Sequence, residues 1–133
     1  MTAANVLLRA ANAIETGRVT WGRRFFIDPA SGCRCALGAL TYAVAPEDLD
    51  GDPFNLPAPL GMLTYEAAEL LANYLINEQG APRCMDDEYG FDVVETVGSW
   101  NDEPERTKAD VVAALRAAAD QHRRHAIAVG GVE

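Results

Sequence analysis

Residues 34–45 read RCALGALTYAVA, and this stretch decides the fold. Apolar residues occur on nearly every side of a helix drawn through it, which is typical of a helix buried at the centre of a domain. Gly38 costs about 1 kcal/mol relative to alanine inside a helix, and close packing against a neighbour is the simplest compensation. We therefore expect residues 34–45 to form a buried central helix around which the other helices pack.

On either side of this segment, apolar residues recur at intervals of three and four, the pattern of helices with one buried face. Four further helices are predicted, at residues 2–16, 64–78, 92–100 and 107–125. Asp92 with Glu95, and Thr107 with Asp110, have the spacing of N-terminal caps. The sequence thus predicts an all-α, mostly helical, compact single domain of about five helices over residues 1–125, with a flexible C-terminal tail at 126–133.

Extended structure is expected at one place. Phe25, Phe26 and Ile27 are aromatic or β-branched, and the residues that follow, DPASG at 28–32, predict a turn. A lone short strand must pair with another, so this segment is expected to form one short β pair or an extended loop. Residues 50–62 contain several prolines and glycines and are predicted to form a loop.

The charge distribution restricts the kind of partner. The chain has 133 residues and a net charge of −9, and most of its acidic residues lie between positions 46 and 110. Such a surface repels phosphate backbones, so we expect no direct nucleic-acid binding. The acidic region is interpreted either as a solvated face or as a docking face for another protein, a basic one on charge grounds. The sequence indicates no oligomeric state.

No apolar run is long enough to span a membrane, and the first residues, MTAANVLLRAANAIE, lack the pattern of a signal peptide. We therefore expect a cytoplasmic protein without a membrane anchor. The cysteines Cys33, Cys35 and Cys84 do not have the spacing of a zinc site, and we expect no metal and no cofactor.

Two motifs carry a resemblance. The first is C-A-L-G-A-L at residues 35–40, and the second is W-N-D at residues 100–102, continued by R-T, V, L-R and A-A between Arg106 and Ala119. With Trp21-Gly22, this arrangement resembles a family of small uncharacterised proteins that are common in actinobacteria and their phages. The resemblance covers about residues 4 to 120 and is poorest in the middle, from Pro46 to Gly90. It implies a shared fold and no particular reaction.

Cys35 is the candidate nucleophile. It lies near the first turn of the expected central helix, where the helix dipole can lower the pKa of a thiol. The candidate bases are His122 and His125, and Asn101 or Asp102 could orient one of them. The alternative interpretation is that Cys35 is a small buried thiol that only packs against its neighbours.

A second cluster of polar and aromatic residues surrounds the W-N-D motif. Trp100, Asn101, Asp102 and Arg106 lie close together in the sequence, and Trp21 would join them if the first and fourth helices are adjacent. Trp and Arg are common at the centres of binding surfaces. The alternative is structural: the same residues can end one helix and begin the next.

The sequence therefore favours a non-enzymatic protein-binding or adaptor module. One alternative is a thiol-dependent hydrolase or transferase that uses Cys35. Another is a small-molecule-binding domain, with a pocket beside Gly38 and Ala39, where small side chains leave room.

Overall fold

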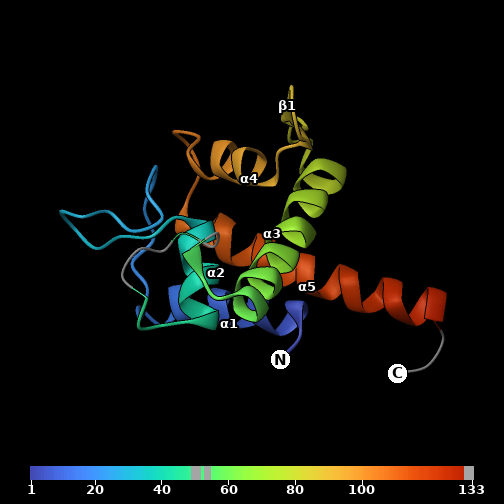
Figure 1. The fold of residues 1–133 in the computed structure, drawn as a ribbon, viewed down its shortest axis with the longest axis horizontal. Helices are drawn as coiled ribbons and strands as arrows, with labels where there is room; N and C mark the ends of the chain where they lie inside the picture. Colours follow the sequence, from blue (N-terminus) through green and yellow to red (C-terminus); the bar gives the residue numbers. More distant parts are fainter. Residues whose placement is uncertain (49–51, 53–54, 131–133) are drawn as a thin grey trace.

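The computed structural model describes residues 1–48, 52 and 55–130, and within them the chain forms five helices and one pair of short strands (Figure 1). The helices are α1 Ala3–Glu15, α2 Ala36–Val44, α3 Ala58–Gln79, α4 Val93–Asn101 and α5 Lys108–Gly130; the strands are β1 Met85–Asp86 and β2 Gly90–Phe91. The predicted mostly helical fold is confirmed.

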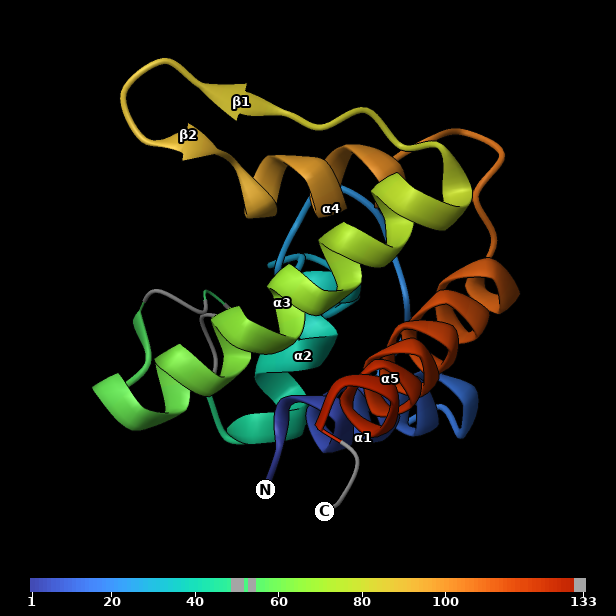
Figure 2. The same cartoon turned by 90° about the vertical axis from the view of Figure 1, so that its right-hand side faces the viewer.

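The predicted central helix is α2, which lies behind α3 and between α1 and α4 (Figure 2). It packs against α1, α3 and α4. All six residues from Ala36 to Thr41, more than one full turn, are buried, so every side of this part of the helix is covered. Because a helix this short is marginal alone, burial of its surface by three neighbours supplies most of its stability. The prediction of a buried helix here is confirmed, with bounds slightly inside 34–45.

Gly38 is the closest point of packing around α2. A Cβ atom at this position would lie 1.8 Å from the carbonyl oxygen of Phe26, so only glycine lets the Phe26 backbone cross the helix here. The expectation of close packing is confirmed. The expectation that Gly38 leaves room for a small molecule is not met, because the Phe26 backbone fills that space.

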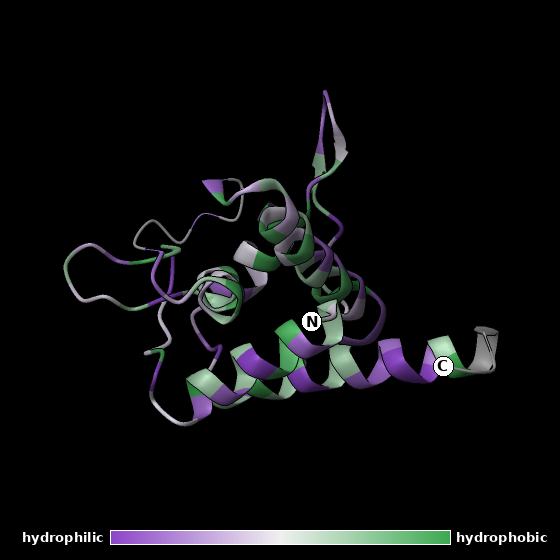
Figure 3. Ribbon diagram, turned by 60° about the horizontal axis from the view of Figure 1, so that its bottom comes forward, coloured by the Kyte–Doolittle hydropathy of each residue, from purple (hydrophilic) through white to green (hydrophobic). Residues whose placement is uncertain are grey.

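The long helix α5 packs against α1 and α3 and continues past the end predicted at residue 125. Residues 126–130 of the expected tail are helical, and residues 131–133 lie outside the described part of the chain. The C-terminal half of α5 extends beyond the other helices (Figure 1) and is largely hydrophilic (Figure 3). None of the helices described has the length and apolar character needed to cross a membrane.

The helix α3 begins at Ala58, well before the predicted start at Thr64, so the second half of the expected loop 50–62 is helical. Pro59 lies in the first turn of the helix, where backbone N–H groups have no acceptor within the helix. Proline, which lacks an N–H, is therefore compatible with the start of the helix and does not break it. Residues 50, 51, 53 and 54 of that expected loop lie outside the described residues.

The short β pair is antiparallel, with Met85 opposite Phe91, and it lies in the connection between α3 and α4. The placement near Phe25 was therefore wrong. The backbone around Phe25 is instead tied to the entry of α2, because Cys35 N–H donates to the Phe25 carbonyl and Asp28 N–H donates to that of Cys33. Only one isolated bridge, between Trp21 and Arg34, forms among the described residues of this segment.

Both predicted caps are present. The Asp92 carboxylate accepts from the N–H of Glu95 at the start of α4. Thr107 and Asp110 cap α5 reciprocally, because each side chain accepts from the other residue's backbone N–H.

Candidate functional site

The side chain of Asn101, at the end of α4, is completely buried and binds the segment after α1, the start of α2 and the neighbouring Asp102. Its Oδ1 accepts from the indole Nε1 of Trp21 (2.8 Å) and from the backbone N–H of Ala36 (2.9 Å). Its Nδ2 donates to the carbonyl of Gly22 (3.1 Å) and to the carboxylate of Asp102 (3.0 Å). These four hydrogen bonds use both acceptor and both donor positions of the amide, so none is left to bind a ligand and the role of the group is structural.

Arginines close the same cluster. The guanidinium of Arg106 lies over the Trp100 ring, 3.8 Å from its centre, and its Nε donates to the Trp100 carbonyl. Arg23 lies over Trp21 and donates to backbone carbonyls of the connector between α4 and α5. The Arg106 contacts hold the connector against the end of α4, and the Arg23 contacts hold it against the segment that follows α1.

The structure therefore brings together all five residues of the predicted binding cluster: Trp21, Trp100, Asn101, Asp102 and Arg106. The segment after α1 carries Trp21 to the end of α4, where Arg24, at a φ of 78°, donates its N–H to Asp102. Trp100 and Asn101 are buried, so they do not face solvent. The contacts found are those expected of the structural alternative.

Cys35 is the N-cap residue of α2 and is 5% exposed. Burial raises the pKa of its thiol, because desolvation outweighs the hydrogen bonds from the first turn of the helix. The thiol lines a pocket of about 420 Å³ together with Ser99 and Asp102, and no histidine lines this pocket. A thiol kept protonated in this way is a poor nucleophile.

The two candidate bases lie elsewhere. His122 is fourteen residues into α5, about 20 Å along the axis from the helix start, and it lines a pocket with Thr2 and Asn5 of the N-terminus. The start of α5 is the end near Asn101 and Cys35, as the contacts of Arg106 and Ala36 show. The structure thus does not bring Cys35 and His122 together, and His125 lies one further turn along.

No three His, Cys, Asp or Glu side chains are grouped to hold a metal ion in the part of the chain that the structure describes. Cys33 and Cys84, both partly buried, are free thiols like Cys35.

Two adjoining concave surfaces lie where α3, the β pair and α4 meet. One pocket, of about 450 Å³, is lined by residues of the β pair and α4, including Tyr89, Phe91 and Val94. The next, of about 470 Å³, is lined by the N-terminal half of α3, including Met62 and Glu66. Tyr65 lines both pockets, so they adjoin, and we call the two together the Tyr65 groove.

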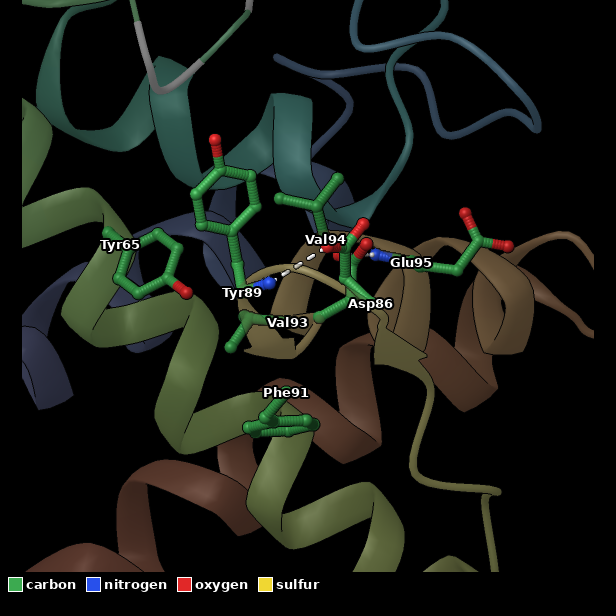
Figure 4. Close-up of a pocket in the computed structure, with 8 residues that line it drawn as sticks. Tyr65, Asp86, Tyr89, Phe91, Val93, Val94 and Glu95 are labelled. Carbon is green, nitrogen blue, oxygen red and sulfur yellow. Dashed lines mark hydrogen bonds between the residues drawn. The ribbon is translucent and has the colours of Figure 1, made fainter.

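Three aromatic side chains line the first of these pockets. Figure 4 shows the rings of Tyr65, Tyr89 and Phe91 around it, with Val93 between Tyr89 and Phe91 and Val94 beside Tyr89. Tyr89 is 82% exposed and Met62 is 73% exposed. Apolar side chains this exposed gain free energy when a partner covers them.

The rim of the groove is acidic. Glu66, Glu69, Asp86, Asp92 and Glu95 line its two pockets, and no lysine or arginine does. The guanidinium of Arg83, which does not line the groove, lies over the Phe91 ring, 4.4 Å from its centre.

Two residues that line the groove have shifted pKa values. The pKa of Tyr65 is raised, first by burial and then by the charges of Glu69 and Asp92, so its hydroxyl stays protonated. The pKa of Asp86 is lowered by the N–H groups of Tyr89 and Glu88, which keep its carboxylate charged.

Local hydrogen bonds present Tyr89 to solvent. The Asp86 carboxylate accepts from the N–H groups of Glu88 and Tyr89 and so closes the turn of the β pair. Gly90 follows with a φ of 83°, which favours glycine. The Asp92 N–H donates to the Cys84 carbonyl and anchors the β pair to α4.

The sequence analysis did not identify this groove. One signal was available: Met62, Tyr65, Glu66 and Glu69 have the spacing of one helix face. That face mixes apolar and acidic side chains and is not the one that packs into the core.

Comparison with known proteins gives one result. No curated protein and no solved structure matches the chain significantly. The model of DUF6197, described as a family of unknown function, matches residues 1–121, close to the range of the expected resemblance. The chain therefore belongs to the DUF6197 family of unknown function.

Proposed function

We propose that the chain is a non-enzymatic protein-binding module that holds a basic segment of another protein in the Tyr65 groove. The observation that carries this proposal is the composition of the groove: three aromatic side chains, of which Tyr89 is exposed, five carboxylates, and no basic residue among those that line it. Its partner would be a segment with lysine or arginine side chains beside one or more apolar anchors.

Each part of the groove has a distinct role in this proposal. Tyrosine provides a large contact area with little loss of conformational freedom and is common at the centres of interfaces. The carboxylates attract a basic segment over a distance of about a Debye length. They also select positively charged partners over negatively charged ones. The net charge of −9 favours the same kind of partner.

A thiol-dependent reaction is less well supported, because Cys35 is buried and its thiol pKa is raised. We further propose that the chain works in the cytoplasm and, from the resemblance of its two motifs, that its relatives are small actinobacterial and phage proteins.

The proposal is tested with a fluorescently labelled synthetic peptide that combines lysine, arginine and leucine, and with a counterpart that has glutamate in place of each basic residue. We expect the purified protein to bind the basic peptide and not the acidic one, as measured by fluorescence anisotropy at physiological salt. Equal binding of both peptides, or binding of neither, would contradict the proposal.

A charge-matched pair of variants separates the groove from general attraction. Glu66→Gln with Glu69→Gln removes two charges that line the groove, whereas Glu78→Gln with Glu105→Gln removes two exposed charges outside it. We expect the first pair to weaken binding about tenfold, since surface charges contribute up to about 1 kcal/mol each. The second pair should change binding less than twofold. Equal losses would show that the peptide senses only net charge.

A further inference from the structure

A second, smaller pocket lies between α1, the residues that follow it and the C-terminal end of α2, and it shares no residue with the Tyr65 groove. Its volume is about 260 Å³. Arg9, Asn12, Arg18 and Tyr42 contribute polar side chains to its wall, and none of its lining residues is acidic. In a chain with a net charge of −9, an acid-free pocket with two arginines requires an explanation.

The two arginines of this pocket lack the internal partners that Arg23 and Arg34 have. Arg23 donates to connector carbonyls, and Arg34 donates to the carbonyls of Gly38 and Asp48. Within the described residues, the only hydrogen bond of Arg9 is to the sulfur of Met1, a weak acceptor, and Arg18 makes neither a side-chain hydrogen bond nor an ion pair.

Neighbouring charges leave the pocket positive. Glu15, the acidic residue of α1 nearest to Arg18 in sequence, forms an ion pair with Arg116, with 2.8 Å between the guanidinium nitrogen and the carboxylate oxygen. Glu47 and Asp48 follow the pocket in sequence without lining it. Burial lowers the pKa of Arg34, and the nearby charge of Asp48 opposes that shift. The Arg34 guanidinium in turn lies over the Tyr42 ring, 5.2 Å from its centre, and adds a third cation beside the pocket.

We propose that this pocket binds a phosphate dianion, either as inorganic phosphate or as the phosphate group of a small monoester. Guanidinium groups bind phosphate oxygens through paired hydrogen bonds, and the amide of Asn12 and the hydroxyl of Tyr42 supply further donors. The volume is below the range of about 300 to 1,000 Å³ found for drug-sized ligands, which favours a ligand smaller than a nucleotide. Ala43 and Val44 give the wall an apolar part that suits a short carbon chain.

The proposal is tested on the intact protein by isothermal titration calorimetry with inorganic phosphate and with glycerol phosphate, and by thermal unfolding with chloride at equal ionic strength as the reference. We expect saturable binding of at least one of the two phosphates, and a melting temperature higher than in chloride. A melting temperature no higher than in chloride would overturn the proposal, as would binding of a phosphopeptide but of neither small phosphate.

Variants locate the site. Arg9→Gln with Arg18→Gln should weaken phosphate binding at least tenfold, and Tyr42→Phe should weaken it by a smaller factor. The control, Lys108→Gln with Arg124→Gln, removes the same charge from α5 and should change binding less than twofold. The alternative is that Arg9 and Arg18 only stabilise the carboxyl ends of α1 and α2. In that case Arg9→Gln with Arg18→Gln will lower the melting temperature, but adding phosphate will raise it as much as in wild type. That result would overturn the proposal.

Discussion

The indole N–H of Trp21 donates to the side-chain oxygen of Asn101 over 2.8 Å, although the two residues lie 80 positions apart. The same oxygen accepts from the N–H of Ala36, in the first turn of α2. One amide therefore joins the segment after α1, the start of α2 and the end of α4. Because a buried polar group without a partner is costly, this amide determines how the three segments fit together.

Replacing Asn101 with alanine should lower the free energy of unfolding by about 3 to 5 kcal/mol, because the Trp21 indole and the Ala36 amide lose their acceptor and the Gly22 carbonyl loses a donor. Denaturant unfolding measures this change. Asn77→Ala, at an exposed position in α3, is the control and should stay within about 0.5 kcal/mol of wild type. A loss below about 1 kcal/mol for Asn101→Ala would show that the amide is dispensable.

Two glycine substitutions should act in opposite directions. Gly38→Ala forces a Cβ into the Phe26 carbonyl, so we expect a loss of about 3 kcal/mol or more despite alanine's higher helix propensity. Gly98→Ala in α4 meets nothing within 4 Å and should gain about 0.5 to 1 kcal/mol. Thermal unfolding compares the two variants. Similar effects at both sites would refute the crossing of the Phe26 backbone over α2.

Helix positions were predictable where the pattern is local. The apolar segment 34–45 and the capping residues Asp92 and Thr107 predicted α2 and the starts of α4 and α5 correctly. The start of α3 was missed, because prolines in the sequence favour a loop as much as a first helical turn. The β pair was misplaced because aromatic and β-branched residues predict strand wherever they occur, whereas the partner of Phe25 is fixed by tertiary contacts.

The candidate site was predictable only in part. The sequence predicts that Trp21 lies near the W-N-D motif if the first and fourth helices are adjacent, and the structure places them together. The burial of Trp100 and Asn101 depends on how the connector folds back over α4, which the sequence does not indicate. The Tyr65 groove combines α3 with the turn at Asp86, and such a surface has no signature in either segment alone.

Cys35 should be unreactive in the folded protein, because burial raises the pKa of its thiol and so lowers the thiolate fraction near pH 8. A variant with Cys33→Ser and Cys84→Ser leaves it as the single thiol. We expect Ellman's reagent to modify this thiol about a hundredfold more slowly in buffer than in denaturant. Rapid modification of the native protein would contradict this account and restore a thiol-dependent activity as the leading hypothesis.

The pair of Glu15 and Arg116 should make stability depend on pH. The hydrogen bond and charge of Arg116 lower the folded-state pKa of Glu15 below 4.5. Its contribution is therefore present above the unfolded-state pKa and is lost as the pH falls through the folded-state pKa. Glu15→Gln should flatten the fall in unfolding free energy below about pH 4.5, as measured by denaturant unfolding from pH 3 to 6. Arg116→Gln should have the same effect, and the double variant should add nothing. Additive effects would show that the pair does not interact.

The position of a bound basic segment tests the central claim most directly. We would record amide ¹H–¹⁵N spectra of the labelled protein while adding the basic lysine, arginine and leucine peptide. The account predicts that the largest saturable shifts fall in residues 56–69 and 86–95, which line the Tyr65 groove, and that residues 9–18 are unaffected. Shifts spread evenly over the acidic surface, or concentrated outside the groove, would contradict it.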